Sequence, residues 1–301
     1  MPRREIACAL LAAASALACG RSAGGIDCSP AAPGAAWLGF TSNRTGNYDL
    51  YLVHTDGSCL QPLTTDPAAD LFPAWTPAGG VGFSSTRASG AGVYVHDLAT
   101  GQETGIPVVG AVATAPDWSP DGRWLAFEAK AQGASRTDVY TVLASGGGAV
   151  ALTSGPGNSG GPRWSTDGAT IYFVSNRTGP YQLYSMAASG AGQVALAGTS
   201  GVLGRPSVSP DGHSIAYARL GAGGVAEVVV RDLGSGAERV VSGQGDGDPA
   251  FDPTGRRLAV SSTRAGNPAI WMVDAADGGH PVQVTSPAGA AIDGQPAFPR
   301  R

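Results

Sequence analysis

Two strands and a tight turn between them are predicted by the stretch Pro116-Asp117-Trp118-Ser119-Pro120-Asp121-Gly122-Arg123-Trp124-Leu125-Ala126-Phe127. In the turn, proline presets φ, the aspartate side chain can bond its own backbone, and glycine accepts a positive φ. Trp118 before the turn and Leu125 and Phe127 after it alternate as the apolar residues of half-buried strands do. The stretch therefore indicates a β-hairpin.

The first strand of this hairpin recurs along the chain. Its signature is a proline followed two residues later by an apolar residue, and the six copies begin at Pro73, Pro116, Pro162, Pro206, Pro249 and Pro296. The copies are 43 to 47 residues apart, and a period of about 40–50 residues is typical of propellers and solenoids. In each unit an apolar-x-aromatic second strand, or its equivalent, precedes a third strand and a shorter fourth one. We predict an all-β fold, a six-bladed β-propeller with four-stranded antiparallel blades.

The first and last segments of the repeat region belong to one blade. Trp37-Leu38-Gly39-Phe40 looks like a second strand whose first strand is missing, and Pro296-Ala297-Phe298 supplies such a first strand. Pairing of residues 295–299 with the first blade would close the ring and remove a free sheet edge. We therefore assign residues 35–301 to the propeller.

The composition agrees with many short strands and turns. The 301 residues include 46 glycines and 22 prolines, with 43% hydrophobic and 14% charged residues. Disordered chains have few apolar residues and high charge, so a disordered protein is excluded. The net charge is −4 and Lys130 is the only lysine. Because no basic stripe is present, nucleic acid is not an expected partner.

The N-terminal segment predicts export from the cytoplasm. Arg3 and Arg4 precede an apolar run, and Ala16-Leu17-Ala18 fits the small-x-small cleavage rule, so residues 1–18 are predicted to be a signal peptide. Cys19 follows at once, which also resembles a bacterial lipobox. Lipidation of Cys19 and plain secretion both remain open, and the protein is expected in the periplasm or anchored to a membrane by lipid. Residues 19–34, rich in Gly, Ala, Ser and Pro, are predicted to form a tether.

The two remaining cysteines outside the export signal are Cys28 and Cys59. In an exported chain two cysteines indicate one disulfide, here between the tether and the first blade. The loop-entropy model gives such a bond about 3–4 kcal/mol of stabilisation. Two free buried thiols are the alternative. No cysteine or histidine spacing indicates a zinc site.

A family resemblance follows from the repeat. The pattern PxWSPDGxxLAF, followed by SNRxG, DLY and LT, resembles the TolB-type β-propeller repeat of bacterial envelope proteins, over residues 35–301. The resemblance implies a six-bladed propeller and a non-catalytic role. TolB carries an additional α/β domain before its propeller, whereas only the tether stands there in this chain. A stand-alone propeller, monomeric and without a cofactor, is expected.

Two sets of charged residues recur in register with the repeat. Arginines stand four residues after the second-strand aromatic or its equivalent, at Arg44, Arg87, Arg177 and Arg264, and aspartates stand three residues before the repeat proline, at Asp70, Asp246 and Asp293. Both sets are expected at one mouth of the central channel. They predict either a site for a polar ligand or cation, or pairing of arginine with aspartate inside each blade.

No arrangement for catalysis stands out. Gly157-Asn158-Ser159-Gly160-Gly161 satisfies the Gly-x-Ser-x-Gly pattern, but it lacks the strand before it and the helix after it that a nucleophile elbow requires. The four histidines are scattered along the chain. We predict a non-catalytic envelope protein that binds a protein or peptide through one face of the propeller. A small-molecule or cation-binding module is the alternative, and a propeller enzyme such as a lyase is a further one.

Overall fold

The computed structural model describes residues 28–29, 37–88, 90–109, 111–131, 133–243 and 245–300. The predicted signal peptide, Cys19 and most of the tether lie outside these residues. The described part of the chain contains no helix that is long and apolar enough to cross a membrane.

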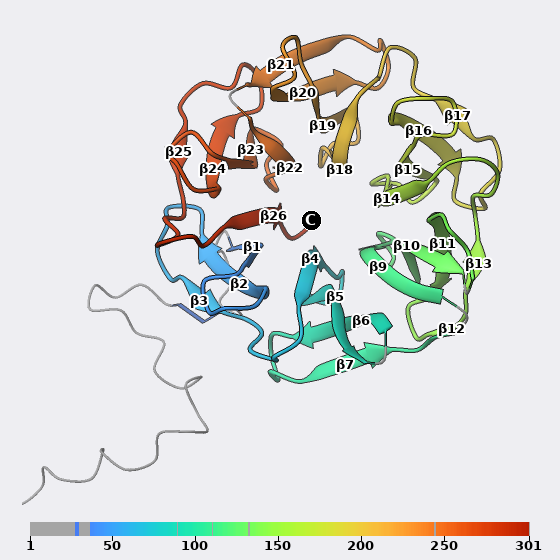
Figure 1. The fold of residues 1–301 in the computed structure, drawn as a ribbon, viewed down its shortest axis with the longest axis horizontal. Coiled ribbons are helices and arrows are strands. Elements are labelled where there is room, and N and C mark those ends of the chain that lie inside the picture. The colour runs from blue at the N-terminus through green and yellow to red at the C-terminus, as the bar shows by residue number, and fades with distance from the viewer. Residues whose placement is uncertain are drawn as a thin grey trace, which may run out of the picture.

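Six four-stranded antiparallel sheets surround a central opening, as Figure 1 shows. From the innermost strand outward, blade 1 contains β26 (Asp293–Ala297), β1 (Trp37–Ser42), β2 (Asp49–His54) and β3 (Gln61–Pro62); blade 2 contains β4 (Asp70–Trp75), β5 (Gly80–Ala88), β6 (Gly90–Asp97) and β7 (Glu103–Ile106); and blade 3 contains β9 (Ala111–Trp118), β10 (Trp124–Ala131), β11 (Asp138–Leu143) and β13 (Val150–Ala151). Blade 4 contains β14 (Ser159–Trp164), β15 (Thr170–Ser175), β16 (Gln182–Ala187) and β17 (Val194–Ala195); blade 5 contains β18 (Val202–Val208), β19 (Ser214–Leu220), β20 (Ala226–Asp232) and β21 (Glu238–Ser242); and blade 6 contains β22 (Gly247–Phe251), β23 (Arg257–Ser262), β24 (Ala269–Asp274) and β25 (Val282–Gln283). A short parallel pair, β8 (Val108–Val109) with β12 (Gly147–Gly148), lies beside blade 3. The predicted six-bladed propeller is confirmed.

The ring is closed by the C-terminal strand. β26 pairs antiparallel with β1, with Ala297 opposite Gly39 and Asp293 opposite Ser42. The closure is confirmed, although the paired strand spans residues 293–297 and not the predicted 295–299. The indole Nε1 of Trp75 also donates to the carbonyl of Ala297 at 3.0 Å, which joins blade 2 to the closing strand.

The core is built from the second-strand aromatics and the apolar residues between blades. Five of these aromatic side chains are fully buried, namely Phe40, Phe83, Phe127, Phe173 and Tyr217. Burial of one such side chain contributes about 1.5–3 kcal/mol. Core clusters also join neighbouring blades, since Phe40 of blade 1 packs in one cluster with Ala259 and Met272 of blade 6.

The hairpin turn forms as its residues require. In blade 3 the Ser119 hydroxyl donates to Asp121 Oδ1 at 2.6 Å, the amide of Arg123 donates to the same oxygen, and Gly122 has a φ of 71°. The same serine-to-aspartate bond is present in blade 4, at Ser165 and Asp167, where it measures 2.6 Å. These turns connect each innermost strand to the second strand.

Every innermost strand carries a β-bulge opposite the aromatic of the second strand or its equivalent. The first residue of each bulge is left-handed, directly before the proline in five blades and two residues before it in blade 5. These residues are Phe72, Ala115, Gly161, Gly204, Asp248 and Gln295, with φ between 47° and 65°. In five blades two residues bulge, whereas in blade 5 three residues, Gly204 to Pro206, lie between Leu203 and Ser207. Bulges redirect side chains and are frequent beside functional sites.

The predicted disulfide joins Cys28 to Cys59, across a sequence separation of 31 residues. It connects the described part of the tether to blade 1, just before β3. Gln61 Nε2 also donates to the carbonyl of Cys28 at 3.0 Å. Cys28 is therefore attached to the outer side of blade 1.

Candidate functional site: the central channel and its mouth

The predicted arginines and aspartates meet inside their own blades. One Arg44 nitrogen donates to both oxygens of Asp293 at 2.8 Å, and Arg87 donates to Asp70 at 2.6 Å. Arg264 pairs with Asp246 in the same way in blade 6. All three aspartate side chains have no exposed surface. The carboxylates therefore lie inside the blades and not on an open face.

Each of the four arginines is also held by a serine and by one or two aromatic side chains. Arg44 Nε donates to Ser42 Oγ at 3.0 Å, and its guanidinium lies 4.7 Å from the ring centre of Tyr51. Arg177 has the same surroundings, but its NH2 donates to Ser159, which replaces the aspartate of the other blades. We call these four groups, at Arg44, Arg87, Arg177 and Arg264, the arginine clamps.

Burial affects the carboxylates of two clamps, those that contain Asp70 and Asp246. Burial raises the pKa of Asp70, and the adjacent Arg87 offsets this effect only in part. One oxygen of Asp70 and one of Asp246 are buried and accept no hydrogen bond from any described residue. The geometry agrees with the second interpretation given above, arginine–aspartate pairing inside the blade. A ligand-binding role for these residues stays a prediction.

A cavity lies at the end of the innermost strands opposite to the arginine clamps. It measures about 470 Å³ and is lined by residues from all six blades. The side chains of Trp75, Trp164, Phe251 and Phe298 form part of its wall. Its rim is built from the hairpin turns and the segment after β26, at Pro77, Pro120, Thr166, Pro210, Pro253 and Pro299. The turn that defines the repeat thus also builds the mouth of the channel.

Charged residues meet at the floor of this cavity. Asp117 of β9 is buried, and both its oxygens accept from Arg300 NH2 at 2.7 Å. Arg163 of β14 donates to Asp117 at 3.0 Å, and the amide of Trp164 donates to it at 2.8 Å. Burial raises the pKa of Asp117, but Arg300 and Arg163, together with the amide of Trp164 and the more distant Arg205, outweigh burial and hold that pKa below its ordinary value.

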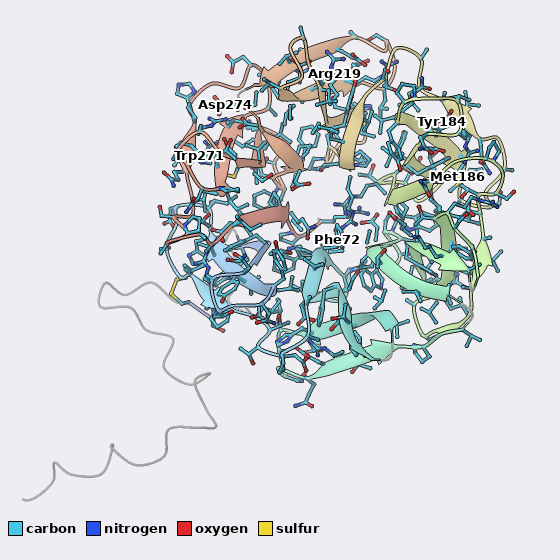
Figure 2. The ribbon with its side chains drawn as sticks, in the orientation of Figure 1. Phe72, Tyr184, Met186, Arg219, Trp271 and Asp274 are labelled. Carbon is cyan, nitrogen blue, oxygen red and sulfur yellow. A yellow bond between two sulfur atoms is a disulfide. The ribbon has the colours of Figure 1, made fainter. Side chains whose placement is uncertain are left out.

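Arg205 crosses the channel deeper inside the ring. Its guanidinium lies 5.7 Å from the ring centre of Phe72, which belongs to the blade directly opposite. Figure 2 shows Phe72 beside the centre of the ring. Arg205 NH2 donates to the carbonyl of Pro116 at 2.7 Å, while its Nε is buried and has no partner among the described residues. A smaller cavity of about 50 Å³ is lined by Arg205, Arg163, Phe72 and others.

The bulges position this part of the channel by bonds between neighbouring blades. The amide of Phe72 donates to Gln295 of blade 1 at 2.9 Å, and that of Ala115 donates to Ser84 of blade 2 at 2.9 Å. The amide of Gly161 donates to Glu128 of blade 3 at 3.2 Å. The first residues of these three bulges are thus held in place by hydrogen bonds to the adjoining blade.

Sequence reasoning missed the channel residues. Asp117 and Arg163 occupy the middle position of the Pro-x-apolar signature, where the other four blades have Ala74, Ser207, Ala250 and Ala297. The opposite charges at this position in two adjacent blades could have indicated a contact between these two residues in the channel. Arg205 lies in the three-residue bulge of blade 5, which the sequence does not mark as longer than the others.

The sequence of this chain matches the model of one known protein family. A model of the TolB beta propeller domain matches residues 81–242 and 190–300, which together span most of the chain. The chain belongs to the TolB beta propeller domain family. This agrees with the resemblance found in the repeat.

Curated relatives match this TolB-type propeller over part of their length. A protein TolB homolog of Chlorobaculum tepidum is 35% identical over 119 residues, which are 39% of this chain and 27% of that protein. A Tol-Pal system protein TolB of Alcanivorax borkumensis is 32% identical over 91 residues, which are 29% of this chain and 21% of that protein. The matched segments thus span about a quarter of these relatives.

A solved structure supports the same fold. The crystal structure of TolB from Acinetobacter baumannii has a TM-score of 0.78 and 23% identity, and the match covers 88% of this chain and 67% of that one. At this identity the likeness shows the fold alone. The TolB-type ring is therefore established, and the chemistry of its channel must be argued from this chain's own residues.

Proposed function

We propose that this chain is a non-catalytic binding protein of the bacterial cell envelope that takes a protein or peptide partner over the mouth of its channel. The cavity of about 470 Å³ carries the proposal, because all six blades contribute to one concave surface. Aromatic walls with a few placed polar groups are typical of binding sites. The names of the curated relatives, which include a Tol-Pal system protein, support a role in the envelope.

Blocking the rim tests the proposal. Thr166 is exposed and lines the cavity, so Thr166→Arg would place a bulky charge at the mouth. Thr104, exposed on the outermost strand of blade 2, supplies the matched control Thr104→Arg. In a pull-down from native envelope, we expect a partner that the wild type and Thr104→Arg retain and that Thr166→Arg loses. A partner retained equally by all three would place the interface elsewhere, and no retained partner would contradict the proposal.

We also propose that residues 1–18 direct export, that residues 19–34 form a tether and that residues 35–301 form the binding module. Acylation of Cys19 would place the ring beside a membrane and fits a role in the envelope. Cys19→Ala should then move the mature protein from the membrane fraction to the soluble fraction. A wild-type protein found wholly in the soluble fraction would contradict the lipid anchor.

The alternatives are a small-molecule or cation-binding module and, further off, an enzyme. A cavity of about 390 Å³ at the clamp end of the channel, lined by Asp248 and Asp293 among others, favours the first of these. An oligogalacturonate lyase in complex with manganese has the same fold, at 14% identity and a TM-score of 0.58. Within the described residues no group of three histidine, cysteine or acidic side chains could hold a metal. Metal analysis, calcium titration and assays on pectic fragments would detect either activity.

A further inference from the structure

The starting point is an arginine that lacks a carboxylate partner. Asp117 already accepts hydrogen bonds from Arg163 and Arg300. Within the described residues no carboxylate forms a salt bridge with Arg205, whose side chain is bonded only to a backbone carbonyl and stacked on Phe72. An arginine deep in a protein is normally paired.

The other acidic groups near Arg205 are engaged elsewhere. Glu128 Oε2 accepts from the amide of Gly161, and burial raises the pKa of Glu128. Asp248 Oδ2 accepts from Ser261 Oγ at 3.2 Å and from the amide of Gln295 at 3.4 Å. Neither group forms a salt bridge or hydrogen bond with Arg205 among the described residues, although Glu128 is close enough to offset part of the charge of Arg205.

The arginines also disfavour one another. Burial, followed by the proximity of Arg163, lowers the pKa of Arg205 well below its ordinary value, and Arg300 adds to the effect. The carboxylates of Asp117 and Glu128 oppose this lowering only in part. A guanidinium nevertheless stays protonated in proteins. The unfavourable charge therefore persists in the folded state, and an anion bound among the three arginines would relieve it.

The position of Arg205 also sets it apart from the clamps. It lies in the one bulge that has an additional residue, and part of its surface faces the channel. Arg163 lines both the large cavity and the small one that Arg205 lines. An extended group that enters through the mouth would therefore meet Arg300 and Arg163 first, and Arg205 below them.

We propose that the channel binds the carboxylate of an acidic side chain of the partner, held among the guanidinium groups of Arg163, Arg205 and Arg300. A planar carboxylate matches the fork of N–H donors on arginine. The inference rests on the proposed function, because the partner segment must enter at the same mouth. It adds the chemistry of the contact, an acidic residue inserted into the ring.

The test uses two capped pentapeptides that differ in one group, Gly-Pro-Glu-Pro-Gly and Gly-Pro-Gln-Pro-Gly, with inorganic phosphate as a separate arm. Tryptophan fluorescence can follow binding, because Trp75 and Trp164 line the cavity. We expect the glutamate peptide to bind at least about tenfold more tightly than the glutamine peptide. Its affinity should fall as salt is raised from about 50 to about 500 mM. Equal binding of the two peptides would overturn the proposal.

Variants separate the site from general charge effects. Arg205→Gln should weaken glutamate-peptide binding at least about tenfold, and Arg205→Lys should weaken it less. Arg239→Gln removes a charge from an exposed position on the outermost strand of the same blade and should leave binding unchanged. Arg205→Gln should melt no lower than the wild type, since it removes a buried cation that is only partly compensated and has no salt bridge among the described residues. Undiminished binding by folded Arg205→Gln would overturn the proposal. Phosphate that binds as tightly as the glutamate peptide and displaces it would also overturn it, in favour of a free-anion site.

The two proposals fail in different ways. If peptide binding depends on Arg205 but no envelope partner is captured, the proposed function fails and the carboxylate site stands. If a partner is captured equally by the wild type and Arg205→Gln, the proposed function stands and the carboxylate site fails.

Discussion

The arginine clamps and the three channel arginines use the same side chain in opposite ways. In each clamp the guanidinium is bonded to a serine, stacked on one or two aromatic side chains and bonded to a buried aspartate or, at Arg177, to Ser159. In the channel, Arg163 and Arg300 share one carboxylate, and Arg205 has none among the described residues. The clamps recur in register in four blades, whereas each channel arginine occurs once.

This difference distinguishes residues that stabilise the ring, the arginine clamps, from residues that are available to bind a partner, the channel arginines. A group that repeats with the blades must satisfy the same local bonds each time, so it serves the blade. A group that occurs once, beside a longer bulge and with incomplete partners, has no such role in the repeat. Unfavourable local arrangements of this kind persist at functional sites because the surrounding structure enforces them.

The largest expected effect comes from removing the strand that serves both regions. Deletion of residues 293–301 removes Asp293 from a clamp, Arg300 from the channel and β26 from blade 1. The ring would be left open with an unpaired sheet edge. We expect a sharp fall in the melting temperature and a loss of cooperativity, measured by circular dichroism. An unchanged melt would show that closure by β26 does not support the ring.

The fold was predictable because its signals are local and repeated. The Pro-Asp-Gly turn, the second-strand aromatics and the spacing of Pro73 to Pro296 each specify a strand or a turn without distant partners. The in-register arginines and aspartates were found for the same reason, although sequence reasoning placed them at a mouth of the channel and left both a ligand site and pairing inside the blade open.

The channel was missed because its chemistry depends on contacts between blades. The interaction of Arg205 with Phe72 joins residues more than a hundred positions apart, and it requires the exact count of residues in one bulge. The left-handed residues Phe72, Ala115, Asp248 and Gln295 also carry no sequence mark, since glycine is the usual residue at such φ values. The amides of Phe72, Ala115 and Gln295 donate to side chains of the adjoining blade, and single-sequence patterns do not report such bonds.

The next largest loss of stability is expected in a clamp that contains an aspartate, and it should exceed the loss in the clamp of Arg177, which contains none. Arg44→Gln would leave the fully buried Asp293 without its cation, and breaking a buried pair typically costs about 3–5 kcal/mol. Arg177→Gln removes bonds to neutral groups only, so about 1–2 kcal/mol is expected. Urea unfolding of both variants measures the difference. Equal losses would mean that the charge pair adds nothing beyond the stacking and serine bonds.

A smaller loss of stability is expected when Asp117 is replaced, and its dependence on pH shows whether the ionised carboxylate is the cause. Its folded pKa is lowered, so its ionised form stabilises the fold above the unfolded value of about 3.9. That contribution is lost as the pH falls through the lower, folded pKa. Asp117→Asn should therefore lower stability at pH 7 by about 1.5–3 kcal/mol and make unfolding less sensitive to acid below about pH 4. Acid titrations of the two proteins with the same slope would contradict the assignment.

The smallest loss of stability is expected when Arg300 is replaced. The same replacement should nevertheless weaken peptide binding clearly. About a third of its side chain is exposed (34%), and Asp117 would keep its bond to Arg163 if Arg300 were replaced. Partly exposed ion pairs contribute about 0–1 kcal/mol, so Arg300→Gln should unfold in urea close to the wild type. The same variant removes the first arginine that an entering acidic group would meet, so glutamate-peptide affinity should fall several-fold. A large stability loss with unchanged peptide binding would place Arg300 with the clamps, as a residue that holds the ring together. The expected pattern, small loss of stability with clear loss of binding, would place it with Arg205 in the channel site.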